Sequence, residues 1–245
     1  MARLARMRAP IPTTTHPAML HTAAAVAPAA VDHRLSWPER VEYWNAHFPK
    51  YPPIMYSHGW TYGVWYTGKG FTRNHLHGQY PPTFLRRVLG LWPDVRESRV
   101  LHACAGTVLH GIRLDLSPRF QPSVIANVET PPFLDKSFDL ILYDPPYDQA
   151  NADIYGVAAK VPSFARVLPA FVRLLPVSGH IGILHWYYPS YSRRKLGLKL
   201  VGLIAVCVGF CSATRIFSIF EKTQEVSAII HPDPGLEGQW PESPK

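Results

Sequence analysis

The sequence predicts an α/β protein built on a seven-stranded, mostly parallel β-sheet with helices on both faces. Short apolar runs alternate with longer segments between residues 99 and 184, which is typical of parallel strands joined by crossover connections. The segment 163–175 has the apolar spacing of an amphipathic helix. Two long β-rich runs joined by a short turn follow, and they favour a C-terminal antiparallel hairpin.

The residues before the sheet are expected to differ from it in character. Residues 1–30 are rich in Ala, Pro and Thr and contain arginines but no acid, which favours a disordered basic arm over a transit peptide. Residues 31–95 are aromatic and punctuated by glycines, so we expect loops and short elements packed on the main body. They end in an amphipathic helix that begins after Pro81-Pro82 and stops near Trp92.

The main domain is expected over residues 96–223, and residues 224–245 are expected to form a flexible Pro-rich tail. Apolar, β-branched runs of the length of a buried strand mark each element of the sheet. The expected strands are 99–103, 112–115, 124–126, 138–143, 181–184, 200–208 and 214–220.

Composition limits the class of protein. A hydrophobic content of 47% supplies a real core, and the longest apolar stretch, 200–210, is too short to span a bilayer, so no membrane association is expected. The three cysteines form no regular framework, which favours a reducing, cytoplasmic compartment. A net charge of +8 suits an acidic partner such as nucleic acid, and it suits a moderately basic soluble enzyme equally well.

Four of the expected strands are followed by residues suited to binding a ligand, and ligands of open α/β sheets collect at the carboxyl ends of strands. Gly106 lies in the turn after the first strand, where a missing Cβ lets the backbone approach a ligand. Asp115 closes the second strand and can accept both hydroxyls of a ribose. Asn127 follows the third strand and can pair with an adenine edge, and Asp144 follows the fourth.

The segment Asp144-Pro145-Pro146-Tyr147 is the most informative motif of the chain. A rigid Pro-Pro turn leaving a buried strand holds a carboxylate, a carbonyl and an aromatic face around one point. This arrangement suits a planar amino group that is gripped while a group is transferred to its nitrogen. A Pro-rich turn with an N-capping Asp is the structural alternative.

Residues 99–221 resemble a class I S-adenosylmethionine-dependent methyltransferase with a Rossmann-like fold. The segment 100–107 resembles the first, cofactor-binding motif, and Asp144 to Tyr147 match the DPPY signature of amino-methyltransferases. Residues 80–85 stand where such enzymes often place a cofactor-covering motif. The resemblance implies that S-adenosyl-L-methionine is bound by the following residues: His102, Ala103, Cys104, Ala105, Gly106, Thr107, Asp115, Asn127, Val128 and Asp144.

The first motif departs from the family pattern, because His102 and Val108 stand where an acidic residue and a second glycine are usual. The resemblance implies methyl transfer to an exocyclic amine, with adenine N6 in DNA ahead of cytosine N4 and DNA ahead of RNA as partner. RNA guanine-N2 and protein glutamine methyltransferases use related turns and remain alternatives. A non-catalytic nucleic-acid-binding protein on a decayed methyltransferase fold is a further alternative.

The substrate side of the predicted site is less well defined. Gly106 and Asp144 lie so close in sequence that no target-recognition domain fits between them, which leaves a low-specificity or single-stranded target open. Tyr155 is expected in a loop at the substrate mouth. An aromatic and basic segment after the fifth strand is expected to stack bases and clamp phosphates, through Tyr191, Arg193, Arg194 and Lys195, or else to be a solvated loop. His75 and His77 lack companion ligands, so no metal site is expected. The sequence gives no oligomeric state.

Overall fold

The computed structural model describes residues 34–68, 80–154, 160–209 and 214–225. Within this part of the chain, the residues from Leu35 onward belong to one compact unit. The arm expected over residues 1–30, Tyr155, both His75 and His77, and nearly all of the expected tail lie outside the described residues.

The described residues form these elements: α1 (Trp37–His47), β1 (Met55–Ser57), β2 (Trp60–Tyr66), α2 (Phe84–Gly90), the 3-10 helix η1 (Glu97–Arg99), β3 (Val100–Ala103), β4 (Ile112–Asp115), the 3-10 helix η2 (Pro118–Phe120), β5 (Val124–Ile125), β6 (Leu140–Tyr143), α3 (Gln149–Ile154), α4 (Phe164–Leu174), β7 (His180–His185), α5 (Arg193–Leu196), β8 (Leu198–Cys207) and β9 (Thr214–Lys222). All seven expected strands, the expected helix at 163–175 and the expected helix after Pro82 are present within a few residues of their predicted bounds.

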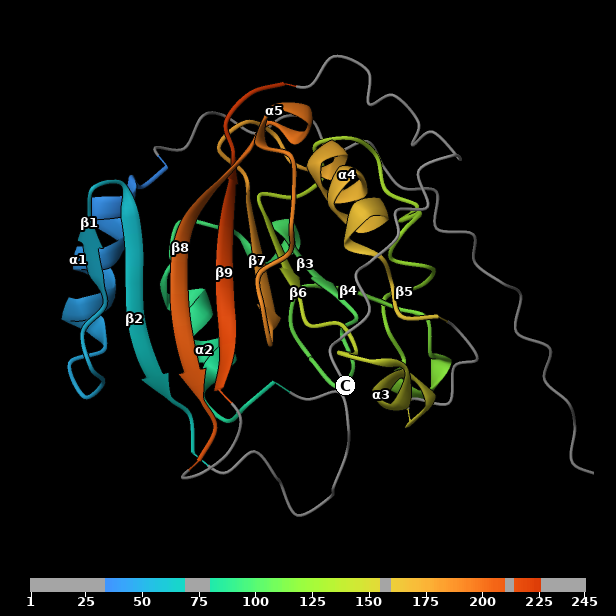
Figure 1. Ribbon diagram of the computed structural model, residues 1–245, viewed down its shortest axis with the longest axis horizontal. Helices are drawn as coiled ribbons and strands as arrows, with labels where there is room; N and C mark the ends of the chain where they lie inside the picture. The colour runs from blue at the N-terminus through green and yellow to red at the C-terminus, as the bar shows by residue number, and fades with distance from the viewer. Residues whose placement is uncertain (1–33, 69–79, 155–159, 210–213, 226–245) are drawn as a thin grey trace, which may run out of the picture. The chain divides into compact units, whose positions relative to one another are not determined.

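The strands of the described chain form one sheet in the order β1-β2-β8-β9-β7-β6-β3-β4-β5 (Figure 1). β9 runs antiparallel to both of its neighbours, which confirms the expected C-terminal hairpin with β8. The sheet therefore has nine strands among the described residues, and the prediction of seven was wrong. The two additional strands are β1 and β2, and β2 pairs in parallel with β8.

The aromatic N-terminal region is more regular than the sequence predicted. A capping box starts α1, in which the Ser36 N–H and hydroxyl donate to Glu39 Oε2 at 2.7 and 2.6 Å. His58 and Gly59 both have positive φ values, 52° and 80°, and they form the tight turn between β1 and β2. The glycines that suggested irregular loops therefore include the turn of a hairpin.

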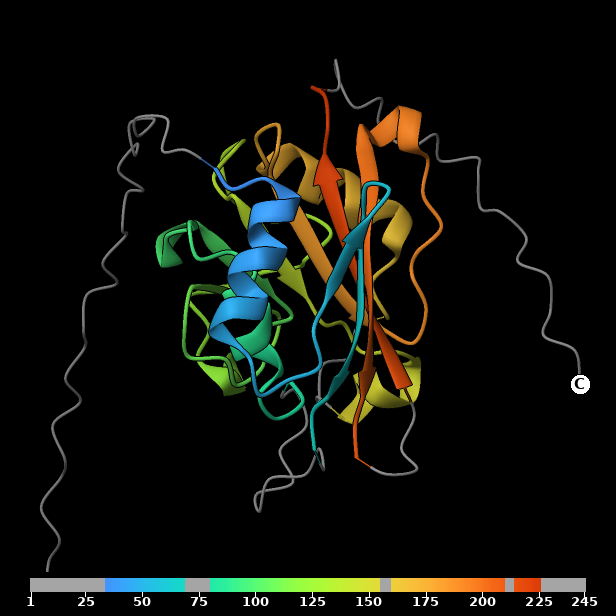
Figure 2. The ribbon, with the colours of Figure 1, turned by 90° about the vertical axis from the view of Figure 1, so that its left-hand side faces the viewer.

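Alternate residues of the central strands face two separate hydrophobic clusters, one on each side of the sheet. Trp44 of α1 and Val88 of α2 belong to one cluster, together with Leu142. Phe171 of α4 belongs to the other, together with Ile141. Seen nearly along the sheet, α1 and α2 lie on one side and α4 and α5 on the other (Figure 2).

The connections in the β3-β4-β5 half of the sheet are unusually short. Only residues 104–111 join β3 to its parallel neighbour β4, and they contain no helix. Parallel neighbours normally need a dozen or more residues, usually with a helix. The 3-10 helix η2 replaces a longer crossover between β4 and β5. The connections of this half of the sheet therefore contain no α-helix.

None of the helices among the described residues is long and apolar enough to cross a membrane. In the same part of the chain, no group of three or more His, Cys, Asp or Glu side chains is arranged to hold a metal ion.

Candidate functional site

The strand order reverses between β3 and β6, because the chain continues from β3 toward β4 on one side and from β6 toward β7 on the other. Ligands of open α/β sheets bind at such a switch point, outside the carboxyl ends of the strands. Asp144 directly follows β6, and Cys104 directly follows β3. Because β9 is antiparallel, its first residues, including Arg215, lie at the same edge. The structure thus brings the two predicted motifs together.

Asp144 is half-buried, and its carboxylate is held by the motif itself. The Tyr147 hydroxyl donates to Asp144 Oδ1 at 3.0 Å. Burial raises the pKa of Asp144 to about 6, while the charge of Arg215 and the Tyr147 hydrogen bond act in the opposite direction. The carboxylate is therefore mostly ionised at neutral pH and is only partly compensated. Pro145 is buried and Pro146 half-buried, so the turn is anchored in the protein.

An aromatic and cationic wall surrounds Tyr147. The Arg215 guanidinium carbon lies 5.1 Å from the Tyr147 ring centroid. The rings of His185 and Trp186 lie 5.0 and 5.1 Å from the same ring, His185 edge-to-face and Trp186 tilted. His185 is buried, which lowers its pKa to about 4, so it is neutral at physiological pH. This wall can receive a flat, uncharged ring.

The turn after β3 is closed onto Asp115. Cys104 and Gly106 both have left-handed backbone conformations, with φ values of 56° and 50°. The Gly106 N–H donates to Asp115 Oδ2 at 2.9 Å, and the Ser117 N–H donates to Asp115 Oδ1 at 2.8 Å. Asp115 therefore shapes the loop that was predicted to bind the cofactor. Strain of this kind in a non-glycine residue is concentrated at functional sites.

The remaining predicted residues of the first motif have different positions. Ala103 and Ala105 are buried, and the Ala105 N–H donates to the Leu114 carbonyl at 3.1 Å. Thr107 is half-buried in the turn. His102 lies within β3 and faces the α2 side of the sheet, where its ring is 6.3 Å from the Tyr80 ring.

Asn127 and Val128 follow β5 at the same edge of the sheet. The Asn127 side chain is exposed, and its Oδ1 accepts the Glu129 N–H at 2.9 Å. Its side-chain N–H groups keep their capacity to donate. Val128 is buried in the α4-side cluster, so its contribution is packing.

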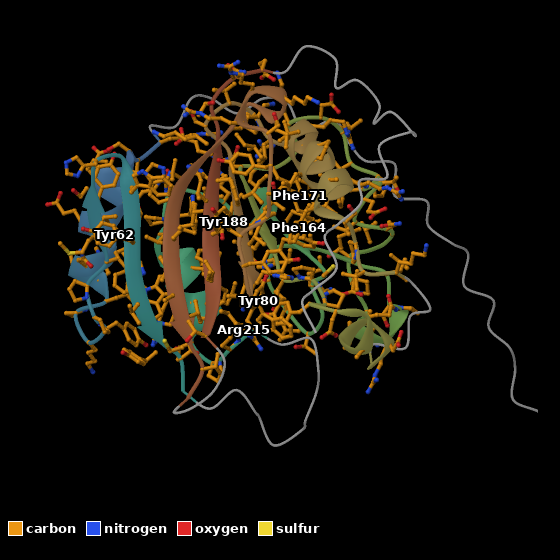
Figure 3. The ribbon with its side chains drawn as sticks, viewed as in Figure 1. Tyr62, Tyr80, Phe164, Phe171, Tyr188 and Arg215 are labelled. Atoms are coloured by element: carbon orange, nitrogen blue, oxygen red, sulfur yellow. The ribbon has the colours of Figure 1, made fainter. Side chains whose placement is uncertain are left out.

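Tyr80 is a site residue whose individual role the sequence did not indicate. Its hydroxyl is buried and has no hydrogen-bond partner among the described residues. Burial raises the pKa of Tyr80 well above its usual value, and the nearby Asp144 and Cys104 raise it further. Figure 3 labels Tyr80 and Arg215 at the same lower edge of the sheet. The only sequence signal was the position of residues 80–85 before the first motif.

The basic segment is not brought to this site. β8 begins at Leu198, which pairs with Lys222 at the far end of β9 from Arg215. α5, which carries Arg193, Arg194 and Lys195, directly precedes Leu198 and lies at the opposite edge of the sheet from Asp144 (Figure 1). The Tyr191 hydroxyl accepts the Leu200 N–H at 3.1 Å, and its ring packs on Phe220. These residues are displaced because residues 186–192 run back along the sheet instead of staying at its carboxyl edge.

Comparison with solved structures finds TrmN from Thermus thermophilus, with 18% identity over 51% of this chain and 44% of that chain and a TM-score of 0.33. The chain thus spans less than half of TrmN. It also finds the 1,6-didemethyltoxoflavin-N1-methyltransferase of Burkholderia thailandensis, which was solved with 1,6-didemethyltoxoflavin and S-adenosylhomocysteine. The sequence identity is 13%, the match covers 76% of this chain and 77% of that chain, and the TM-score is 0.31. No protein-family model and no curated protein matches the chain.

Proposed function

We propose that this protein is an S-adenosylmethionine-dependent N-methyltransferase that acts on an exocyclic amino group of a nucleobase, with adenine N6 in DNA as the first expected acceptor. The observation that carries the proposal is the Asp144 carboxylate at the switch point, bonded through Oδ1 to Tyr147 and bordered by an aromatic wall. Asp144 Oδ2 has no hydrogen bond to any other described residue. It is therefore available to accept an N–H from an amino group.

The residues of the turn after β3 fit the cofactor in part. The buried Tyr80 hydroxyl lacks a partner among the described residues, and unpaired buried hydroxyls are costly unless a ligand or water satisfies them. Each carboxylate oxygen of Asp115 accepts one backbone N–H, from Gly106 or Ser117, and each has a lone pair left to accept a hydrogen bond from a ligand. In the proposal, Gly106, Asp115, Asn127 and Tyr80 hold the cofactor, whose sulfonium supplies an electrophilic methyl group.

The chain's own residues then prepare the amine. An exocyclic nitrogen is a poor nucleophile because its lone pair is delocalised into the ring. Hydrogen bonds from the amine to Asp144 Oδ2 and to the Pro145 carbonyl would favour a pyramidal nitrogen and direct its lone pair. The ionised Asp144 also stabilises the positive charge that develops on the nitrogen during attack. Tyr147, Trp186 and the neutral His185 offer aromatic surfaces for the base.

The direct test uses purified full-length protein, methyl-labelled S-adenosylmethionine, and single-stranded DNA, duplex DNA, RNA or protein as acceptor. Nucleoside mass analysis is expected to find the label as N6-methyladenine in DNA. Label on RNA guanine N2 or on protein glutamine would keep the amine chemistry and change the acceptor. Cofactor binding without label on any acceptor would contradict the proposal.

A second candidate is nucleic-acid binding without catalysis. The observation that favours it is the helix-free connection 104–111, which leaves the cofactor loop with no helix N-terminus behind it. Isothermal titration with S-adenosylhomocysteine separates the two candidates. The catalytic proposal expects binding that weakens in the Asp115→Ala variant, whereas the second candidate expects no binding.

A further inference from the structure

The outer face of β2 carries a row of exposed aromatic side chains. Trp60, Tyr62 and Tyr66 are 41%, 45% and 63% exposed, although the residues between them, such as Thr61 and Trp65, are fully buried. Val64 belongs to the same row, and Met55 of β1, which pairs with Tyr62, lies beside it. Exposed apolar rows of this size on one face are uncommon and mark binding surfaces. We call Trp60, Tyr62 and Tyr66 the aromatic row.

The geometry of the aromatic row suits nucleobases. Trp60 and Tyr62 lie about 6.6 Å apart on the same face, and Tyr66 lies about 13 Å beyond Tyr62, so each ring can take one base of an extended single strand. The residues of β8 that pair with Tyr62, Val64 and Tyr66 are Leu203, Ala205 and Cys207, so no charged side chain interrupts the surface there. Aromatic rings accept any base, because stacking uses the π-face that all bases share.

A cationic cluster lies on the same side of the sheet. α5 carries Arg193, Arg194 and Lys195, all exposed, and none of them forms an ion pair within the described chain. Leu196 of α5 packs into the cluster that contains α4, which places α5 on the side that the aromatic row faces. The chain passes from α5 directly into β8, the neighbour of β2. Thr61 of β2 pairs with Gly202 near the beginning of β8, so α5 lies toward the Trp60 end of the row. Its positive charge would attract the phosphates of a strand stacked on the row.

We propose that the aromatic row, together with the cations of α5, is a binding platform for single-stranded nucleic acid. It would supply a recognition surface on the sheet itself. Figure 3 labels Tyr62 on β2 and Tyr188 nearer the centre of the sheet. Tyr188 and Trp186, 50% and 46% exposed, belong to the segment that follows β7. Tyr66 ends β2, four strands from Asp144 and so about 19 Å away along the carboxyl edge.

The binding activity does not depend on catalysis, but delivery of a base to Asp144 rests on the proposed function. Binding is measured by fluorescence anisotropy with a labelled single-stranded DNA of about twelve nucleotides and the full chain. The row is changed to Trp60→Thr, Tyr62→Thr and Tyr66→Thr, because threonine keeps the β-propensity of an exposed strand position. Each substitution is expected to weaken binding about tenfold.

Matched controls separate stacking from folding. Tyr62→Phe and Tyr66→Phe keep the ring and are expected to bind like the wild type. Leu134→Thr removes another exposed apolar side chain outside the row and is expected to have no effect. Arg193→Gln with Lys195→Gln is expected to reduce the slope of log K against log salt by about 1.4. Thermal unfolding of every variant confirms that the sheet is intact.

The proposal is overturned if the threonine variants bind the oligonucleotide as the wild type does. It is also overturned if sedimentation shows a wild-type dimer that the same threonine substitutions dissociate, without oligonucleotide binding, because the row is then an interface between two copies. Tight binding with no methyl transfer by the wild type would contradict the proposed function and leave the platform standing.

Discussion

At the scale of single residues, Asp144 is charged at neutral pH in surroundings that disfavour its charge. Burial outweighs the combined effect of Arg215 and Tyr147, and its pKa rises to about 6. A carboxylate that is incompletely solvated is a better acceptor for an incoming amine than one surrounded by water. The same burial destabilises the fold, which is a common cost of functional sites.

The first prediction concerns this cost. The folded-state pKa of Asp144 lies above the value of 3.8 expected in an unfolded chain. Ionisation of Asp144 therefore lowers the free energy of unfolding as pH rises from about 4 through 6. Asp144→Asn is therefore expected to raise the free energy of unfolding at pH 8 by about 1 to 3 kcal/mol, with little change at pH 4. Denaturant unfolding at both pH values measures this. An equal change in the free energy of unfolding at pH 4 and pH 8 would contradict the raised pKa of Asp144.

The second prediction concerns the pH dependence of methyl transfer. Ionised Asp144 accepts a stronger hydrogen bond from the amine than the protonated form does, and only its negative charge stabilises the positive charge on the nitrogen, so kcat/KM is expected to rise with pH through about 6 and then level off. Tyr147→Phe removes the hydrogen bond that lowers the pKa, so the rise is expected to move to higher pH. Tyr187→Phe, in a nearby tyrosine without that bond, serves as the control. A profile unchanged by Tyr147→Phe would show that Asp144 does not set it.

At the scale of elements, the packing of β6, β7 and β9 depends on a missing side chain. A Cβ placed on Gly182 of β7 would lie 2.6 Å from Phe217 Cζ and 2.9 Å from Leu142 Cδ2. Phe217 is buried and packs against Trp65 and Phe84, so it has little freedom to move. The central strands therefore fit closely only because residue 182 is a glycine.

The third prediction follows from this contact. Gly182→Ala is expected to lower the free energy of unfolding by roughly 1 to 3 kcal/mol, as overpacking of a core does. Combining it with Phe217→Leu is expected to cost less than the sum of the two single changes, because the smaller side chain makes room. Denaturant unfolding of the two single variants and the double variant tests this. Strict additivity would indicate that the two residues do not compete for space.

At the scale of the whole molecule, two buried histidines oppose Asp144 in the response to acid. Burial lowers the pKa of both His102 and His185 to about 4, so they remain neutral in the folded state when the unfolded chain binds protons below about pH 6.5. The stability that they contribute is therefore fully present above pH 6.5 and is lost as the pH falls toward 4. In that range each histidine makes the free energy of unfolding rise with pH by about 1.4 kcal/mol per pH unit. Asp144 contributes one slope of the opposite sign, so the two histidines outweigh it.

The fourth prediction is that the protein loses stability on acidification between pH 6 and 4, and that His102→Leu weakens this loss. Both ring nitrogens of His102 lack a partner among the described residues, so an apolar replacement of similar size removes a cost without breaking a bond. Thermal unfolding of the two proteins from pH 4 to 8 is the measurement. His47→Leu, at an exposed histidine of α1, is the control. A wild-type acid response retained in His102→Leu would contradict the role of His102.

The sequence by itself determined the strands from β3 to β9, the helices α2 and α4, and the motif at Asp144, because periodicity and turn chemistry are local properties. It did not reveal that β2 joins β8, since pairing between segments distant in the chain depends on which edges remain free. Only the tertiary structure placed Tyr80 and Arg215 beside Asp144 and moved Arg193 to the opposite edge. Those positions follow from the direction in which each strand runs through the sheet, and strand direction is not a local property of the sequence.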